Sequence, residues 1–167
     1  MTGPAFFTGA VVVVTVRPHD GGWQTLLLKR TRSPLKGTWL YPTGRIEAEE
    51  TAAVCAVREL YEETAVRAER LYSANFVQPF YAPDREAIAL FPVFVAHLRA
   101  DAEIRLSEEA SDHLWCSFDK ARGQVPVSAA RLVLQHVERE VLPFAVPESL
   151  HFDPLNGHPL GSGAGAD

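Results

Sequence analysis

Three glutamates lie at helical spacing in the segment Arg58-Glu59-Leu60-Tyr61-Glu62-Glu63. At about 100° per residue, steps of three and four residues place these carboxylates on one face of a helix, which we predict over residues 50–63. The opposite face is apolar and carries Ala53, Val54, Val57, Leu60 and Tyr61. Carboxylates this close repel one another, and Arg58 is the basic residue beside them. A divalent cation would relieve the repulsion, because hard cations bind carboxylate oxygens.

The composition narrows the class of protein. The 167 residues fit one domain, and 47% of them are apolar, which is enough for a substantial core. A net charge of -5 argues against the strong basic patch typical of proteins that bind bulk nucleic acid. The run Val11 to Val14 is too short to span a membrane, and no secretory signal pattern is present. Cys55 and Cys116 are far apart, which favours free thiols in a reducing compartment, so we expect a cytoplasmic protein with no membrane partner.

Strand and turn signals surround the acidic helix. Runs rich in β-branched or aromatic residues predict two hairpins and one further short strand, at residues 10–16 with 25–29, 71–78 with 87–98, and 113–117. A last helix is predicted over 128–141, with Ser128 as its N-cap. This order predicts an α+β fold, a sandwich with a mixed sheet between helices. Pro and Gly accumulate further on, so we expect one domain over 1–143 and an irregular tail over 144–167.

Gly44 begins a pattern of fixed spacing that includes the acidic segment. Five residues separate it from Glu50, and seven more lead to Arg58-Glu59-Leu60-Tyr61-Glu62-Glu63-Thr64-Ala65-Val66. This pattern resembles the Nudix box, which fixes many identities over 23 positions, residues 44 to 66 here. The resemblance to the Nudix hydrolase family implies an α/β/α sandwich and hydrolysis of a nucleoside diphosphate linked to another group.

Two positions depart from the family's pattern. Ala65 stands where the family has Gly, a position after the helix at which a positive φ is often required. An alanine there either ends the helix differently or tolerates strain of about 1 kcal/mol. Thr43 replaces a frequent Gly, and together the two departures resemble the branch that acts on nucleoside triphosphates and dihydroneopterin triphosphate.

The resemblance also assigns roles to residues. It implies that Glu59, Glu62, Glu63 and the backbone carbonyl of Gly44 bind Mg²⁺ or Mn²⁺. It implies that Arg58 orients the acids through ion pairs and that Glu50 supports them. The general base is either a glutamate of the box or an acid on a distal loop. Glu109, ahead of Trp115, is our candidate for that distal acid or ligand, and a solvated loop is the alternative.

Substrate contacts are less specific in the sequence. Arg30 follows the second strand and is a candidate for binding phosphates, since guanidinium groups make bidentate contacts with them. Phe80 and Tyr81 are candidates for stacking on a base, although aromatic residues in strands are more often part of the core.

The lead hypothesis is a metal-dependent pyrophosphohydrolase that cleaves a nucleoside triphosphate to the monophosphate and pyrophosphate. ADP-ribose, dinucleoside polyphosphates and dihydroneopterin triphosphate are alternative substrates. A module that senses a nucleotide without cleaving it belongs to a different class, as does a purely structural acidic helix. The expected partner is a small nucleotide, and the resemblance leaves a homodimer open.

Overall fold

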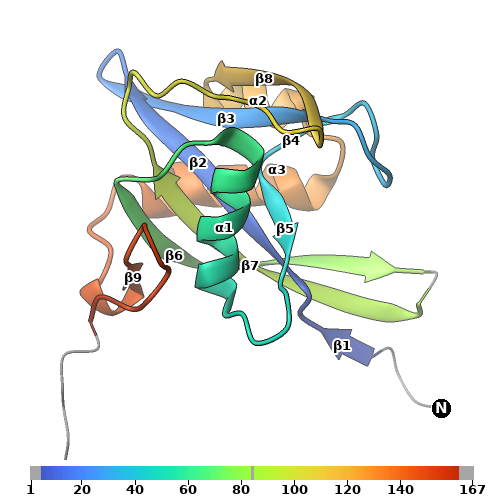
Figure 1. Ribbon diagram of the computed structural model, residues 1–167. Helices are drawn as coiled ribbons and strands as arrows, with labels where there is room; N and C mark the ends of the chain where they lie inside the picture. Colours follow the sequence, from blue (N-terminus) through green and yellow to red (C-terminus); the bar gives the residue numbers. More distant parts are fainter. Residues whose placement is uncertain (1–4, 84, 162–167) are drawn as a thin grey trace, which may run out of the picture.

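The computed structural model describes residues 5–83 and 85–161. A mixed nine-stranded sheet lies between helices, with α1 on one face and α2 and α3 on the other (Figure 1). The fold class predicted from the sequence is therefore confirmed. Within the described ranges, no helix is long and apolar enough to cross a bilayer.

Both predicted hairpins are present, and two central strands join them. The antiparallel pairs are β2 (Ala10–His19) with β3 (Gly22–Arg30), and β6 (Arg70–Ala82) with β7 (Ala87–His97). Parallel pairing of β2 with β7 makes one sheet of the two hairpins. The main strand order is β4-β3-β2-β7-β6-β9, while β1 pairs with β7, β5 with β2, and β8 with β3. The bounds of these shorter strands are Ala5–Phe7 (β1), Trp39–Leu40 (β4), Thr43–Arg45 (β5), Ala110–Cys116 (β8) and His151–Phe152 (β9).

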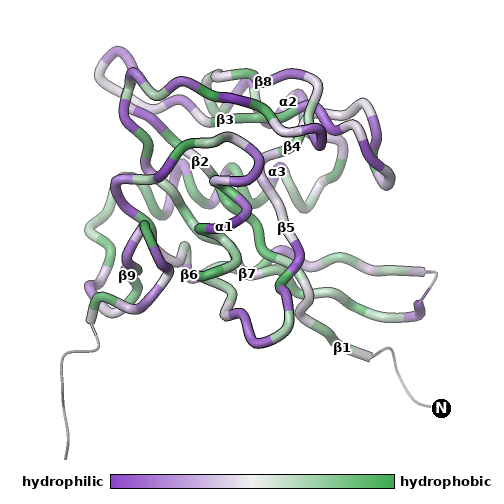
Figure 2. Tube along the Cα trace, viewed as in Figure 1, coloured by the Kyte–Doolittle hydropathy of each residue, from purple (hydrophilic) through white to green (hydrophobic). Residues whose placement is uncertain are grey.

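The alternation of β2 builds a core on each side of the sheet. Val12, Val14 and Val16 pack with the apolar residues of α2 and α3, whereas Val11 and Val13 pack with those of α1. A strand that is buried on both faces is apolar throughout, which explains its uninterrupted valines. Figure 2 shows the complementary pattern, with hydrophilic residues at the turn between β2 and β3 and in the loop that enters α1.

Helix α1 begins two residues after its predicted start, whereas α3 begins at residue 128 as predicted. Helix α1 spans Ala52–Thr64, because the side chain of Thr51 caps it by accepting from the Val54 amide. Glu50 stays outside the helix. Helix α2 spans Phe118–Gln124 and α3 spans Ser128–His136, and a π-helical turn, Val137–Val141, continues α3. The N-cap prediction for Ser128 was wrong: Val127 occupies that position and makes no side-chain cap.

The C-terminal region carries more structure than its composition suggested. Residues Glu148–Leu150 form a 3₁₀ turn, and β9 adds to the sheet by pairing with Leu71 and Tyr72 of β6. The irregular tail expected from residue 144 is thus corrected over this stretch. The physical reason is tertiary packing, since the Phe152 ring contacts that of Phe94 edge-on at 5.7 Å between centroids. Residues 162–167 lie outside the described ranges.

Candidate active site

The three acids of α1 differ in exposure. Glu59 and Glu63 are buried, at 8% and 6% exposed, whereas the side chain of Glu62 is 57% exposed. Tyr61, expected on the apolar face, is also exposed, and the Arg67 guanidinium lies 4.3 Å above its ring. The prediction that Tyr61 lies on the buried apolar face was wrong, because its ring is at the surface and packs against the Arg67 guanidinium instead. The face of α1 that enters the protein therefore carries two carboxylates.

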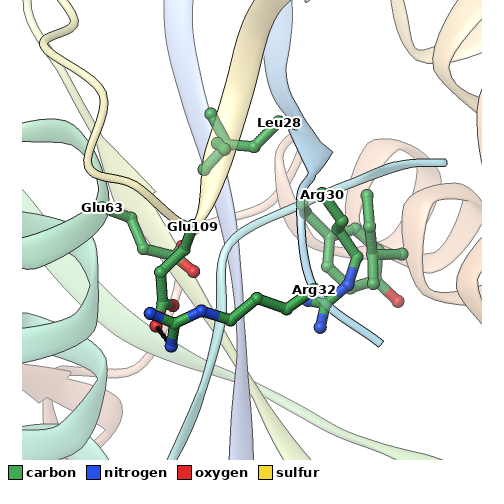
Figure 3. A pocket seen from close by; sticks show the side chains of 8 residues that line it. Leu28, Arg30, Arg32, Glu63 and Glu109 are labelled. Atoms are coloured by element: carbon green, nitrogen blue, oxygen red, sulfur yellow. Dashed lines mark hydrogen bonds and ion pairs between the residues drawn. The ribbon is translucent and has the colours of Figure 1, made fainter. Parts of the chain in front are cut away.

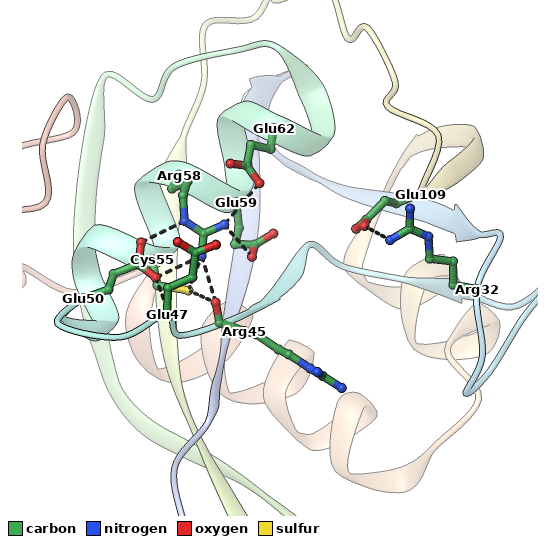
Figure 4. A network of polar contacts seen from close by, with 9 residues as sticks. All are labelled: Arg32, Arg45, Glu47, Glu50, Cys55, Arg58, Glu59, Glu62 and Glu109. Carbon is green, nitrogen blue, oxygen red and sulfur yellow. Dashed lines mark hydrogen bonds and ion pairs between the residues drawn. The ribbon is translucent and has the colours of Figure 1, made fainter.

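Arg58 donates to five residues around these acids, Cys55 among them through its Sγ at 3.6 Å (Figure 4). Its Nε and Nη2 donate to the two carboxylate oxygens of Glu50 at 2.8 and 2.9 Å. Its Nη1 donates to Glu59 Oε1 at 2.8 Å and to Glu62 Oε2 at 3.1 Å. Its Nη2 also donates to the Arg45 carbonyl at 2.8 Å. These contacts lower the pKa of Glu50 to about 2 and raise that of Arg58, so both stay charged.

Gly44 lets the backbone of β5 approach α1 closely. It pairs with Val11 of β2. A Cβ atom at Gly44 would lie 1.9 Å from both Cγ and Cδ of Glu59, which no real side chain tolerates. The first glycine of the sequence pattern therefore lies directly against the first glutamate of the acidic segment, and a side chain there would force Glu59 or β5 to move.

The carboxylate of Glu63 has one oxygen whose hydrogen-bonding capacity is not satisfied. Among the described residues, its Oε2 is buried and has no hydrogen-bond partner. Burial raises the pKa of Glu63 well above its usual range, and the nearby charges of Glu59 and Glu109 raise it further. Arg30 and the Thr43 backbone act in the opposite direction. Burying a carboxylate oxygen that has no hydrogen-bond partner costs free energy. Binding a cation or a proton at this oxygen would remove that cost.

The distal loop brings Glu109 toward the acids of α1. Thr31, just after β3, fixes that loop, because its amide donates to the Glu109 carbonyl at 3.0 Å and its hydroxyl to the Glu108 carbonyl at 2.7 Å. A small hollow of about 30 Å³ is lined by Glu63, Glu109, Arg30 and Arg32, among others (Figure 3). The structure thus brings together Glu109, Arg30 and the helix, three features that are far apart in the sequence.

Arg32 also borders this hollow and forms an ion pair with Glu109. Strand β3 ends at Arg30, so strand alternation does not place Arg32, and the sequence gives no specific signal for this contact. Arg30 itself donates to the Pro34 carbonyl at 3.3 Å and to Thr43 Oγ1 at 3.5 Å. Two guanidinium groups therefore border the acids.

The donor set suits a divalent cation. In the described part of the chain, no three His, Cys, Asp or Glu side chains already converge on one point. Arg58 holds one oxygen of Glu59 and one of Glu62. The orphan oxygen of Glu63, beside Glu59, Glu109 and the Gly44 cradle, supplies the oxygen-rich surroundings that Mg²⁺ and Mn²⁺ prefer. The residues present fit such an ion.

A larger apolar cleft begins next to this site. It measures about 630 Å³, and its lining includes Arg45 of β5, Phe7, Pro34, Phe80 and Phe91. The Phe80 and Phe91 rings stack with centroids 6.4 Å apart. Tyr81 does not line this cleft, and its hydroxyl donates to Glu86 at 2.8 Å. Of the two aromatic candidates, only Phe80 is placed to meet a ligand there.

Comparison with known proteins agrees with this geometry. The NUDIX domain family model matches residues 7–136. The chain belongs to the Nudix family. That membership confirms the resemblance drawn from Gly44 to Val66.

The solved structures that resemble this chain share little sequence identity with it. A C. elegans Ap4A hydrolase in a binary complex has a TM-score of 0.69 at 21% identity, covering 81% of this chain and 98% of that one. An E. coli dihydroneopterin triphosphate pyrophosphohydrolase has a TM-score of 0.66 at 20% identity, covering 82% and 98%. At such identities the likeness shows the fold alone. An octanoyltransferase of Myxococcus xanthus is 32% identical over 130 residues, 77% of this chain. The chain spans about a third of that relative's length, 35%.

Proposed function

We propose that this Nudix hydrolase cleaves a nucleoside triphosphate to the monophosphate and pyrophosphate, with Mg²⁺ or Mn²⁺ bound at Glu59, Glu62, Glu63 and the Gly44 carbonyl. The observation that carries the proposal is the buried, partnerless oxygen of Glu63 beside two further carboxylates. A divalent ion would satisfy that oxygen, neutralise phosphate charge and lower the pKa of a water molecule.

The residues of the chain divide the remaining work. Arg58 holds Glu59 and Glu62 in place through hydrogen bonds of 2.8 and 3.1 Å, while Glu50 fixes Arg58 by two contacts. Arg30 borders the same hollow and can bind a phosphate oxygen. Glu63 and Glu109 both lie there, and either can take the proton from the attacking water.

The cleft lined by Phe80 suits a flat, largely apolar group. Gly44 contacts the acids while its neighbour Arg45 lines the cleft, so one strand, β5, borders both sites. We infer that a substrate with phosphates at the acids extends past β5 and places its base against Phe80, where stacking tolerates different bases. This arrangement supports a nucleotide over a substrate without an aromatic group.

A substrate screen tests the proposal. The purified protein would be incubated with nucleoside triphosphates, ADP-ribose, Ap4A and dihydroneopterin triphosphate, each with Mg²⁺ and with Mn²⁺, in water enriched in ¹⁸O. We expect fastest turnover of a nucleoside triphosphate to monophosphate and pyrophosphate, and mass spectrometry identifies the phosphorus attacked. Faster turnover of another compound would replace the substrate, while saturable nucleotide binding without turnover would favour a sensing module.

A further inference from the structure

The segment of residues 151–161 lies against the first turn of α1. Strand β9 attaches it to the sheet edge at β6, and Figure 1 shows it beside α1, at the red end of the colour scale. It follows the 7–136 region matched by the family model. Its contact with α1 is thus a feature of the chain outside that match.

Asp153 organises this segment into a compact turn. Its amide donates to the His158 carbonyl, its carbonyl accepts from the Gly157 amide, and its Oδ1 accepts from the Leu155 amide, each at 2.8 Å. Leu160 donates its amide to the His151 carbonyl at 3.0 Å, which closes the base of the turn. The turn is therefore tied together by its own backbone and presents Gly157 at a fixed place.

Gly157 brings this turn into backbone contact with α1. The residue is buried and has a φ of +74°. A Cβ atom there would lie 2.6 Å from the Val54 nitrogen, 2.7 Å from the Val54 Cα and 2.8 Å from the Ala53 carbonyl carbon. These atoms belong to a helix backbone and cannot rotate away as a side chain would. Both the conformation and the contact require glycine.

Helix α1 is thus held at two points. Gly157 meets it at Val54, and Gly44 meets it at Glu59, with no room for a methyl group at either place. At a rise of 1.5 Å per residue, Val54 and Glu63 are separated by about 14 Å of rigid helix, so a displaced first turn moves the acids.

We propose that residues 151–161 clamp α1 and that Gly157 is a positioning residue for Glu59, Glu62 and Glu63. The inference rests on the proposed function for its catalytic consequence. The mechanical part, that this turn sets the place of α1, stands on the contact alone.

The test compares Gly157→Ala with Gly21→Ala. Gly21 has nearly the same φ, +75°, but a Cβ there meets nothing within 4 Å, so this variant carries the backbone strain without the contact. Asp153→Ala is a gentler third variant that loosens the turn without adding an atom against α1. For each variant we would measure the melting temperature, amide hydrogen exchange along α1, Mn²⁺ affinity by electron paramagnetic resonance, and kcat and KM.

We expect Gly157→Ala to speed exchange at the first turns of α1 and to weaken Mn²⁺ binding by about tenfold or more. Its kcat should fall while KM stays near that of the wild type, and Asp153→Ala should follow in the same direction with smaller changes. Gly21→Ala should lower the melting temperature and leave the amide exchange of α1, the Mn²⁺ affinity, kcat and KM unchanged. If Gly157→Ala does not fold, the amide exchange and Mn²⁺ affinity of Asp153→Ala decide whether the turn positions α1.

The clamp is overturned if α1 exchanges at the wild-type rate in both turn variants, or if Gly21→Ala speeds that exchange equally. Failure of the proposed function looks different. A wild-type protein that binds no Mn²⁺ and cleaves no compound of the screen removes the catalytic role, while the exchange data still decide whether the turn positions α1.

Discussion

The acidic face of α1 and the cleft lined by Phe80 share strand β5 but are built in opposite ways. On α1, the buried carboxylate of Glu59 is held by Arg58 and lies against the backbone of Gly44. The cleft is open and largely apolar, and Phe80 is 42% exposed. Polar groups that hold one another in place are suited to catalysis, because a reaction rate depends on positioning the reacting groups to a fraction of an ångström. An open apolar surface suits selection among substrates, where contacts are less directional.

Of the variants that test the difference between the acidic face and the cleft, Glu63→Gln should have the largest effect on kcat. The amide keeps the shape of the side chain but loses the charge, so we expect kcat to fall by about a thousandfold. The melting temperature should hold or rise, because the charge of a buried carboxylate with one unpaired oxygen is removed. Steady-state kinetics and thermal unfolding measure both. Glu69→Gln, at an exposed position outside the site, is the control, and near wild-type turnover in Glu63→Gln would remove Glu63 from the reaction.

Replacing Gly44 by alanine disturbs the same face without touching a charge. The new Cβ would overlap the Glu59 side chain, so either Glu59 rotates away or β5 and α1 separate, and we expect kcat to fall by about a hundredfold. Gly123→Ala is the matched control, since a Cβ there meets nothing within 4 Å. Equal activity in the two variants would show that close approach of β5 is not required.

Replacing Phe80 by alanine tests the cleft. Loss of a stacking surface should raise KM by about tenfold and leave kcat nearly unchanged, since the acids are untouched. Tyr81→Ala, its neighbour outside the cleft, should leave both constants near wild type. A larger effect at Tyr81 than at Phe80 would move the base to the other side of the hairpin.

Replacing Ala65 by glycine has the smallest expected effect. Ala65 ends α1 with a φ of 56°, in the left-handed region, so the strain anticipated from the sequence is present and tolerated. Glycine should raise the free energy of unfolding by about 1 kcal/mol without changing kcat. Urea denaturation measures the first quantity. An unchanged or lower stability would mean that the alanine methyl group makes a compensating contact.

The sequence predicted the acidic face better than the cleft, and the reason is local. Helical spacing placed Glu59 and Glu63 together, and the pattern from Gly44 implied a close neighbour, because both features depend on short stretches of backbone. The cleft collects Phe7, Pro34, Arg45 and Phe80 from four separate segments, and only the sheet topology brings these together.

Errors in the prediction have the same origin. Glu50 was predicted at the start of the helix, where an acid favours the helix dipole, but its carboxylate binds Arg58 and helix α1 begins after it. The tail was expected to be irregular from its Pro and Gly content, yet Phe152 packs on Phe94 and Gly157 on Val54. Composition reports local preference, and tertiary contacts decide the outcome when they bury enough surface.

A titration of Mn²⁺ into the wild type and into Glu63→Gln, followed by electron paramagnetic resonance, tests the central claim most directly. If the orphan oxygen of Glu63 belongs to a cation site, the wild type should bind Mn²⁺ saturably and the variant should bind it at least about tenfold more weakly, with both proteins fully folded. Identical Mn²⁺ binding by the two proteins, or no saturable binding by the wild type, would contradict that claim.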